Sequence, residues 1–363
     1  MAAPTAPVKG RGATFNPANR FRSEAREAVD DGWTGPAEAG DDEAPPPPKT
    51  VVRIQQARTI IARNDSPDIP FTQSINPYQG CEHGCVYCYA RPSHAYLDLS
   101  PGLDFETQLF AKPNAADLLR AELARPGYVC EPIALGANTD PYQPIEREWR
   151  ITRQVIDVLA AHDHPLTITT KGALVERDLD LLAPMAAKRL VRVYVSIAML
   201  DKGLARTLDP RAPAPQRRLE AVAALAQAGV PVGVLVAPVI PGLTDRDLEA
   251  ILEAAAAHGA TGAAWIMLRL PREVAPLFRD WLRAHHPLRA DHVMSLVNQV
   301  RGGRDNDSRF GARMRGQGEF AELIRRRFAI AARRFGLDAG HSPLDTSLFR
   351  PPAPAASRQQ SLF

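Results

Sequence analysis

Cysteine is scarce in this sequence, which has only 4 among its 363 residues. Three of them are clustered between positions 81 and 88, so a disulfide framework is excluded. The sequence also lacks an uncharged apolar run of 18 residues, which excludes a membrane-spanning helix, and it begins without the apolar stretch of a signal peptide. We therefore expect a cytoplasmic protein whose thiols stay reduced.

The positive charge of the chain is concentrated towards the carboxyl end. The formal net charge is +3, yet residues 301–363 alone carry 12 arginines against 6 acidic side chains. Arginine favours forked contacts with phosphate and stacking on aromatic rings over simple charge attraction. With 45% apolar residues, the chain can also bury one core of barrel size. The composition is that of a folded domain with a basic extension.

The clustered cysteines have the spacing C-x3-C-x2-C, with Cys81, Cys85 and Cys88 on one short stretch. Gly80 and Gly84 give this stretch the backbone freedom to wrap three thiolates around one centre. An iron–sulfur cubane held by three cysteines keeps one iron open for a small molecule. The spacing therefore favours a cluster of that kind as the metal centre.

A zinc site is the alternative interpretation of the same cysteines. Closed structural zinc sites use four ligands, usually as two separated pairs, and this stretch supplies three thiols. A zinc knuckle would need a histidine as its fourth ligand, and His83 or His94 is near enough in sequence to provide one.

The cysteine stretch and one later stretch resemble a known family. The signature of the radical S-adenosylmethionine (SAM) superfamily is C-x3-C-x-aromatic-C, and Tyr87 stands at its aromatic position. Within that superfamily, Cys-Glu-His-Gly-Cys-Val-Tyr-Cys-Tyr and the later Asn-Thr-Asp-Pro-Tyr-Gln-Pro-Ile-Glu resemble the branch that contains spore photoproduct lyase. The resemblance implies a 4Fe-4S cluster that reductively cleaves SAM, so that a 5'-deoxyadenosyl radical abstracts hydrogen from a substrate.

From about residue 74 the sequence alternates between short β-rich runs and helical patterns. The runs cover 132–137, 166–170, 191–198, 230–237 and 263–270, and the helical patterns lie near 114–125, 147–161, 177–188, 215–228, 245–258 and 273–284. With the strand that leads into the cysteines, they make six strand–helix units around a parallel sheet. Six units predict an α/β fold with a partial (β/α)6 TIM-like barrel, which is also the fold that the resemblance implies. An open flavodoxin-like sheet is the alternative.

In such a barrel the chemistry takes place at the carboxyl ends of the strands. Thr139, Lys171 and Ser196 lie at or after the ends of successive strands and match positions that contact SAM in the photoproduct-lyase pattern. Lys171 offers a positive charge for the SAM carboxylate, and the two hydroxyls can donate hydrogen bonds. Ile240, before Pro241-Gly242, lets an apolar side chain approach the flat adenine closely. We expect these four residues to bind SAM.

Three further residues are predicted to act in catalysis. Tyr87 and Tyr89 flank Cys88, where their rings can cover the cluster and the adenine and exclude water. Asp140 belongs to a polar stretch, residues 140–146, which is expected to face the substrate.

One position departs from the photoproduct-lyase pattern. The lyases carry a cysteine just before the Thr-Asp-like stretch, where it donates hydrogen to the product radical, and this chain has Ala137 there. The fourth cysteine, Cys130, lies seven residues earlier, where a buried structural thiol is expected. We therefore do not expect thymine-dimer repair by the same route.

Both ends of the chain are predicted to differ from the barrel at 51–300. Residues 1–50 are rich in Pro and Ala, end in a polyproline stretch and predict a disordered tail. Residues 301–340 predict a basic helical extension, and 341–363 a flexible tail. The extension opens with a basic loop that is suited to following a phosphate backbone and contains Arg301, Arg304, Arg309, Arg313 and Arg315.

The last five residues resemble the peptide by which bacterial repair and replication proteins dock on the sliding clamp. Leu362 and Phe363 would fill an apolar pocket and Gln359 would fix the register, although Gln360 stands where leucine is usual. The sequence thus predicts a radical SAM enzyme with DNA or RNA as a candidate substrate, a candidate contact with the clamp and no membrane partner. A non-catalytic Zn or Fe-S module that acts at DNA or the clamp is the alternative function.

Overall fold

The computed structural model of the chain describes residues 6–22, 48–340 and 342–353. Its main sheet has seven strands in the order β10-β9-β8-β7-β6-β3-β2. In chain order these are β2 (Ile61–Arg63), β3 (Gln73–Ile75), β6 (Ile133–Leu135), β7 (Leu166–Thr170), β8 (Val191–Ser196), β9 (Val232–Val239) and β10 (Gly262–Met267). β3 and β6 to β10 run parallel, whereas β2 is added antiparallel to β3. The partial barrel of parallel strands that the sequence predicts is confirmed, and the strand before the cysteines is β3.

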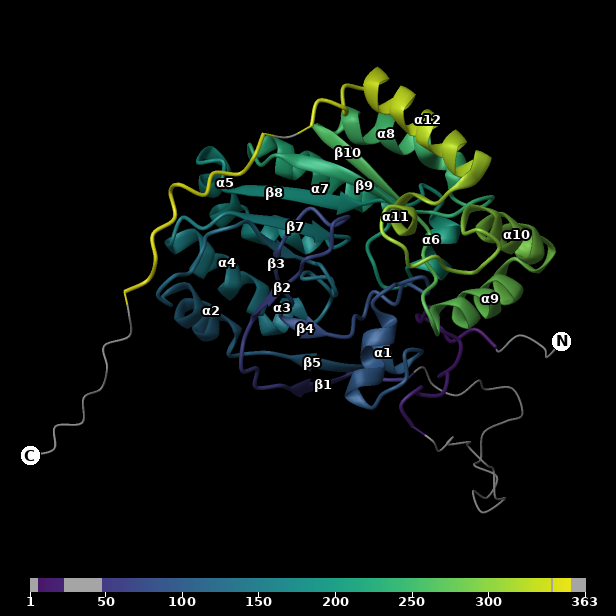
Figure 1. The fold of residues 1–363 in the computed structure, drawn as a ribbon, viewed down its shortest axis with the longest axis horizontal. Coiled ribbons are helices and arrows are strands. Elements are labelled where there is room, and N and C mark those ends of the chain that lie inside the picture. Colours follow the sequence, from purple (N-terminus) through teal and green to yellow (C-terminus); the bar gives the residue numbers. More distant parts are fainter. Residues whose placement is uncertain (1–5, 23–47, 341, 354–363) are drawn as a thin grey trace, which may run out of the picture.

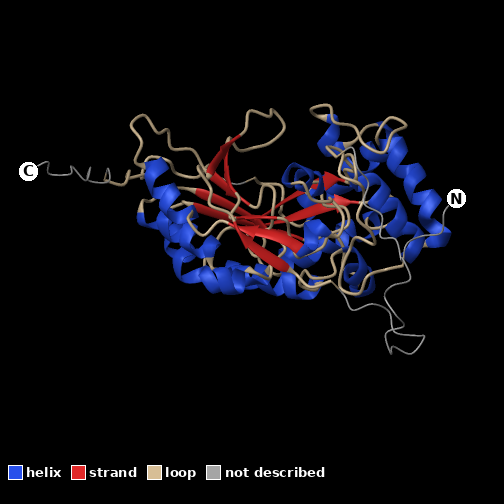
Figure 2. Cartoon of the chain, turned by 90° about the horizontal axis from the view of Figure 1, so that it is seen from below, coloured by secondary structure: helices blue, strands red, loops and turns tan. Residues whose placement is uncertain are grey.

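The predicted helices return the chain from strand to strand. They are α2 (Ala115–Leu123), α3 (Glu146–Trp149), α4 (Ile151–Ala161), α5 (Leu179–Ala187), α7 (Pro215–Gln227), α8 (Leu248–Ala257) and α9 (Val274–His285). Each longer helix buries one face against the sheet because its apolar residues recur at helical spacing, as Ile151, Val155 and Leu159 do in α4. Figure 1 shows the strands side by side, with α2, α4, α5 and α8 outside them. Figure 2 shows the strands at the centre and the helices around them.

Two helices that the sequence patterns do not predict lie on the side of the cysteine loop. They are α6 (Lys202–Leu208), in the connection after β8, and α10 (Ala290–Val300), which follows α9. Together with α9 they supply much of a second apolar core, which also contains Cys85, Val86 and Tyr87. The fold therefore has one core under the main sheet and another beside the cysteines.

A second, three-stranded sheet leads into the cysteines. Its order is β1-β5-β4, with β1 (Val51–Ile54) parallel to β5 (Gln108–Ala111) and β4 (Tyr78–Gln79) antiparallel to it. The cysteine loop starts directly after β4, and α1 (Asp104–Thr107) leads into β5 on the far side of the loop. Both ends of the loop are thereby held by one small sheet.

The basic extension folds as α11 (Ala312–Arg315) and α12 (Gly318–Arg334), and α12 lies along α8 and β10 (Figure 1). α12 buries Ala321, Ile324, Ala331 and Ala332. It turns Arg325 and Arg326 outward, where both pair with Glu322 on the same helix. The amphipathic helix that the sequence predicts is therefore present, and Glu322 neutralises part of its basic face.

Parts of both predicted tails pack on the barrel. Residues 6–22, in the tail expected at 1–50, lie against the cysteine loop through contacts given below. At the other end, the Asp345 amide donates to the Arg189 carbonyl at 3.0 Å, and the Arg350 amide donates to the His162 carbonyl at 3.0 Å. Phe349 packs edge-on against the His164 ring. The clamp-like peptide at 359–363 lies outside the described residues.

None of the helices in the described part of the chain combines the length and the apolar character needed to cross a membrane.

Candidate active site at the cysteine loop

The cysteine loop is a series of tight turns that glycine makes accessible. The Cys81 amide donates to the Phe105 carbonyl at 2.9 Å, and the Cys88 amide donates to the Cys85 carbonyl at 3.2 Å. Gly80 and Gly84 adopt φ of 76° and 68°. A Cβ at Gly80 would lie 2.5 Å from Leu109 Cδ2, and one at Gly84 would lie 2.7 Å from Glu106 Oε2. Both glycines are therefore needed for conformation and for space.

The three thiols of the loop are free and shielded from water. Cys81 and Cys85 are each 7% exposed, and Cys88 is half-buried. Burial raises the pKa of all three thiols. A buried thiol ionises when a positive centre such as an iron cluster compensates the desolvation.

The three thiols suit an iron–sulfur cluster by their chemistry, although their side chains are not arranged around a common centre. Three soft sulfur ligands on one loop suit a 4Fe-4S cluster with an open iron. Among the described residues, no three His, Cys, Asp or Glu side chains are arranged as a metal site. The two histidines that are candidates for the fourth zinc ligand make other contacts, since His83 Nδ1 lies 3.3 Å from Asp140 Oδ2 and His94 Nε2 lies 2.9 Å from the Gln108 carbonyl.

A buried ion pair supports the loop from behind. The Arg91 and Glu106 side chains are both fully buried and paired. Arg91 also donates to the Cys85 carbonyl at 2.9 Å and to the Gly102 carbonyl at 2.8 Å. The desolvation of this buried pair is offset by the several hydrogen bonds that the guanidinium and the carboxylate both make, so the loop backbone has a charged anchor.

Residues 10–22, here called the N-terminal strap, complete that anchor. The Gly12 and Ala13 amides donate to the two Glu106 carboxylate oxygens at 3.0 and 2.8 Å. Ala13 is fully buried in the core that contains Cys85. A Cβ on Gly12 would lie only 1.8 Å from the Gly84 carbonyl oxygen. The strap thus lies directly on the cysteine loop, a contact that no periodicity in the sequence signals.

Asp140, predicted as catalytic, is the hydrogen-bond centre of the rim. Its carboxylate accepts from the Thr170 hydroxyl at 2.6 Å, the Lys171 amide at 2.7 Å and the Tyr142 amide at 2.9 Å. Although burial opposes its charge, His83 and these donors hold the pKa of Asp140 well below its usual range. These contacts join the ends of β6 and β7.

Most of the polar stretch around Asp140 faces inward. The Glu146 carboxylate accepts hydrogen bonds from the Tyr78 hydroxyl and from Arg177, and Tyr142 donates to Asp178 at 3.0 Å. The expectation that residues 140–146 form a rim facing the substrate is thus not met by Tyr142 and Glu146, because buried ion partners from later elements hold them.

Lys171 is half-buried beside the cysteine loop, with its Nζ 5.7 Å from the centre of the Tyr87 ring. Burial opposes its charge, but the Cys85 sulfur and the Asp209 carboxylate hold the pKa of Lys171 above its usual value. Asp209 is 1% exposed and bonded to Arg218 Nη2 at 3.0 Å. Sequence reasoning missed Asp209 and Arg218 because neither lies at a strand end.

The Asp209 and Tyr87 side chains are neighbours in the buried interior. Among the described residues neither Asp209 Oδ1 nor the Tyr87 hydroxyl has a hydrogen bond of regular geometry, but the two side chains are close enough to interact with each other. Burial, reinforced by the Asp209 carboxylate, raises the pKa of Tyr87 well above its usual value. The Tyr87 side chain is therefore neutral, and its ring lies beside Lys171 and Asp209.

The other predicted SAM contacts lie at the same end of the barrel. The Thr139 hydroxyl donates to the Tyr78 carbonyl at 3.2 Å, and the Ser196 hydroxyl donates to the Ala237 carbonyl at 3.2 Å. Ile240 is fully buried in the core that contains Cys85 and Tyr87. Both hydroxyls thus have backbone partners, and Ile240 shares an apolar core with residues of the cysteine loop.

Tyr89, the residue after Cys88, is 47% exposed at the mouth of the barrel. Its hydroxyl donates to the Ala137 carbonyl, so the tyrosine lies beside the position that departs from the photoproduct-lyase pattern. Cys130 is half-buried and free, and burial raises its pKa to about 11.

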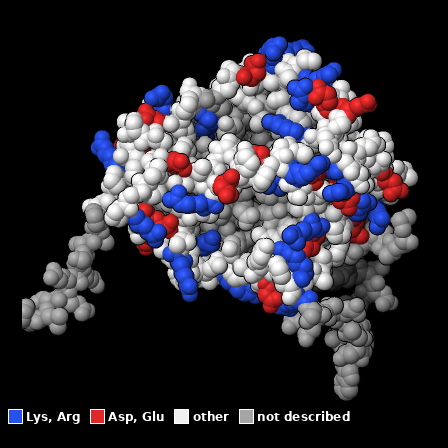
Figure 3. Space-filling view, in the orientation of Figure 1, with Lys and Arg blue, Asp and Glu red and all other residues white. Residues whose placement is uncertain are grey.

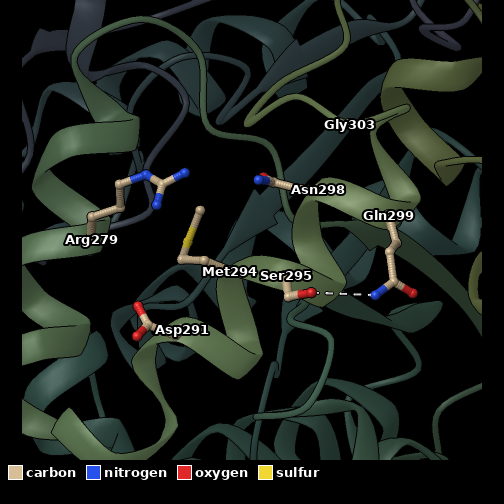
Figure 4. Close-up of a pocket in the computed structure, with 7 residues that line it drawn as sticks. All are labelled: Arg279, Asp291, Met294, Ser295, Asn298, Gln299 and Gly303. Atoms are coloured by element: carbon tan, nitrogen blue, oxygen red, sulfur yellow. Dashed lines mark hydrogen bonds between the residues drawn. The ribbon is translucent and has the colours of Figure 1, made fainter.

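A separate cavity of about 510 Å³ lies between α9 and α10. Figure 4 shows Arg279, Asp291 and Met294 around it, with Ser295 bonded to Gln299 at 3.4 Å. None of the predicted site residues lines this cavity, so it is distinct from the cysteine loop.

Comparison with known proteins identifies the family. Residues 75–255 match the model of the Radical SAM superfamily. An uncharacterised protein of Mycobacterium tuberculosis is 40% identical over 277 residues, which cover 76% of this chain and 78% of that protein. An uncharacterised protein of Methanocaldococcus jannaschii is 28% identical over 171 residues, which cover 47% of this chain and 61% of that protein. The chain therefore belongs to the radical SAM superfamily and is a radical SAM enzyme, of a family whose members use a 4Fe-4S cluster and SAM.

Solved structures show the same fold. Spore photoproduct lyase complexed with dinucleoside spore photoproduct superposes with a TM-score of 0.57 at 18% identity, covering 78% of this chain and 79% of that chain. A double mutant of the lyase with bound AdoMet and dinucleoside spore photoproduct gives the same score and coverage. The partial barrel of this chain is thus shared with the lyase.

Proposed function

We propose that Cys81, Cys85 and Cys88 hold a 4Fe-4S cluster and that the rim beside them binds SAM for radical chemistry on a nucleic-acid substrate. The observation that carries the proposal is the set of three free thiols on one glycine-shaped loop, next to Lys171 at the end of β7. When bound, the reduced cluster and SAM supply a 5'-deoxyadenosyl radical that abstracts a hydrogen atom.

The residues of the rim suit the parts of SAM. Lys171 keeps its charge and attracts the SAM carboxylate, while Asp209, held by Arg218, is suited to the ammonium group. Thr139 and Ser196 can offer their hydroxyls to ribose or carboxylate oxygens. The neutral rings of Tyr87 and Tyr89, with Ile240, exclude water from the reacting atoms. The chain thus provides binding, orientation and shielding.

The likeness to a lyase solved with a dinucleoside photoproduct supports a nucleic-acid substrate. Repair by the lyase route is not proposed, because Ala137 has no thiol to return hydrogen to a product radical. The Tyr89 hydroxyl, bonded to the Ala137 carbonyl, is the polar group of this chain beside that position. We propose a catalytic role for Tyr89 and a positioning role for Asp140, which orders the loop after β7 through its hydrogen bonds to Thr170 and Lys171.

Anaerobic reconstitution tests the proposal. The reduced holoprotein is expected to bind iron and sulfide and to release 5'-deoxyadenosine from SAM, measured by chromatography. Cys85→Ala should lose both the iron and the cleavage. Lys171→Ala should keep the iron and weaken SAM binding by about tenfold, or ~1.4 kcal/mol, because one charged contact is lost.

Lys202→Ala, which changes an exposed lysine on α6, is the matched control and should behave as wild type. A fully loaded wild-type protein that releases no 5'-deoxyadenosine would contradict the proposed activity. Equal SAM affinity in Lys171→Ala and Lys202→Ala would contradict the role of Lys171.

A further inference from the structure

Three arginines near the end of β10 form no ion pair with any described residue. They are Arg269, Arg301 and Arg315, and burial lowers the pKa of each, that of Arg301 to about 10. A buried cation without a counter-charge is costly, and proteins normally give it a carboxylate or a set of carbonyl acceptors. The hydrogen bonds of each guanidinium show which of the three arginines still has free N–H donors for a ligand.

Two of the three are satisfied by backbone. Arg301 Nε donates to the Leu268 carbonyl at 3.1 Å, and its Nη1 donates to the Ala312 and Arg313 carbonyls at 2.9 and 3.0 Å. It therefore ties the end of β10 to α11. Arg315 donates to the Trp265 carbonyl at 2.7 Å and lies 4.7 Å from the centre of the Trp265 ring. Both arginines organise the extension rather than offer it to a ligand, which revises the basic loop that the sequence predicts.

Arg269 differs from them. Its Nε is buried and has no hydrogen-bond partner among the described residues, and its Nη1 donates to the Met314 sulfur at 3.7 Å, a weak acceptor. The guanidinium carbon lies 5.3 Å from the centre of the Tyr89 ring. Because Tyr89 directly follows Cys88 and is exposed, this guanidinium, which has no ion pair with a described residue, lies at the mouth of the candidate active site.

The carboxylate of Asp68 acts electrostatically on Arg269 but is paired with another arginine. Asp68, in the loop between β2 and β3, accepts from Arg313 Nε at 2.8 Å and from the Gly311 amide at 3.3 Å. This ion pair connects the two edges of the partial barrel, since β2 lies at one end of the sheet and α11 follows β10 at the other. Arg313 also lies 4.8 Å from the centre of the Phe310 ring, which is 61% exposed.

Guanidinium groups and exposed rings thus alternate at this opening, as Arg269 over Tyr89 and Arg313 over Phe310. Figure 3 shows basic side chains interspersed with acidic ones over the face that it draws, which therefore carries no broad basic patch. Paired cations and aromatic faces are the means by which proteins hold single-stranded nucleic acid, with phosphate on the cation and bases on the ring.

We propose that Arg269, with Arg313 beside it, binds a phosphate of a nucleic-acid strand whose bases lie against Tyr89 and Phe310. The proposal rests on the proposed function in that this strand is the substrate of the radical chemistry. The strand would bind where the Asp68–Arg313 ion pair connects the β2 edge of the partial barrel to its β10 edge. Arg269 binds the phosphate that lies next to the reacting nucleotide.

Fluorescence anisotropy of a labelled single-stranded oligothymidylate on the reconstituted holoprotein tests the proposal over a range of salt concentrations. Arg269→Gln should weaken binding by about tenfold and reduce the slope of log affinity against log salt by about 0.7, the value for one phosphate contact on a single strand. Arg269→Lys should keep the salt slope, since the charge stays, while losing part of the affinity with the fork. Tyr89→Leu should weaken binding without changing the slope.

Arg325→Gln on the outer face of α12 removes an arginine of the same type and should leave affinity and slope unchanged. The proposal is overturned if Arg269→Gln matches Arg325→Gln in both quantities. It is also overturned if a polyglutamate peptide of equal charge competes as well as unlabelled oligothymidylate, because the site would then prefer carboxylates. Iron content confirms that each variant is folded and loaded.

The two proposals fail separately. A holoprotein that releases 5'-deoxyadenosine but shows no Arg269-dependent binding of the oligonucleotide would overturn the phosphate site alone. A holoprotein that binds the oligonucleotide through Arg269 but releases no 5'-deoxyadenosine would overturn the proposed activity alone.

Discussion

Gly12→Val is expected to detach the N-terminal strap and loosen the cysteine loop. The new Cβ would lie 1.8 Å from the Gly84 carbonyl oxygen and 3.1 Å from the Val86 amide nitrogen. Both are backbone atoms of the cysteine loop and cannot rotate away, so the strap must move. The Gly12 and Ala13 amides then lose the Glu106 carboxylate, which in turn holds Arg91.

The size of the effect follows from those contacts. Each hydrogen bond to a charged group contributes about 1.5 to 3 kcal/mol, so two lost bonds amount to roughly 3 to 6 kcal/mol. With an unfolding entropy of about 2.1 cal/mol/K per residue, a protein of this size loses about 1.3 °C of thermal stability per kcal/mol, and the expected fall in Tm is therefore about 4 to 8 °C. The buried pair of Glu106 and Arg91 also becomes accessible to water, which removes support from the Cys85 carbonyl.

Three measurements check this expectation on the reconstituted protein. The variant should unfold at lower temperature, be cleaved faster by a protease within residues 10–22, and lose its iron faster in air than wild type. Ala18→Val adds two methyl groups at an exposed position of the same strap and should change none of these. Wild-type values in Gly12→Val would refute the idea that the strap supports the loop.

Three further outcomes follow from buried charges. Asp209→Asn should destabilise the fold by about 3 to 5 kcal/mol in thermal or denaturant unfolding, because Arg218 loses its counter-charge, whereas exposed Asp157→Asn should not. Asp140→Asn should lower the free energy of unfolding by about 1.5 to 3 kcal/mol for each lost hydrogen bond from a backbone amide. It should also weaken SAM binding measured by titration, since the Lys171 amide is one of those donors. Unchanged stability would mean that the carboxylate does not order this loop. Burial lowers the pKa of His164 to about 4 from an ordinary value of 6.5, so its contribution to stability is complete above pH 6.5 and is lost as pH falls towards 4. The decline of Tm over that window should be shallower in His164→Gln, and an equal slope would contradict it.

The main barrel follows from local pattern. The predicted runs at 166–170 and 191–198 correspond to β7 and β8, and the pattern at 215–228 to α7, within a few residues. Such agreement is expected because hydrophobic periodicity depends on neighbours in sequence, and a strand buried on both faces shows it plainly. The helices α6 and α10 were not predicted because their apolar faces pack on the second core, beside the cysteines rather than along the regular alternation.

The cysteine loop was likewise predictable from its own residues. The ligand spacing and the two glycines lie within one short segment, so a single stretch of sequence contains both the donors and the conformational freedom they need. Lys171 and Ile240 were located through the strand ends; Lys171 lies beside the Tyr87 ring, and Ile240 belongs to the same apolar core as Cys85 and Tyr87. The roles of the predicted site residues in binding and catalysis stay predictions for the experiments above.

Sequence alone therefore determined the alternating barrel, the three sulfur donors and the end of the barrel at which they lie, because each depends on residues that are close along the chain. Tertiary structure alone decided which charges are buried and what they hold: Glu106 under the strap, Asp209 beneath Lys171, and Asp68 across the opening on Arg313. A charged residue gives no local sign of burial, since its desolvation is compensated by partners that folding brings from far along the chain.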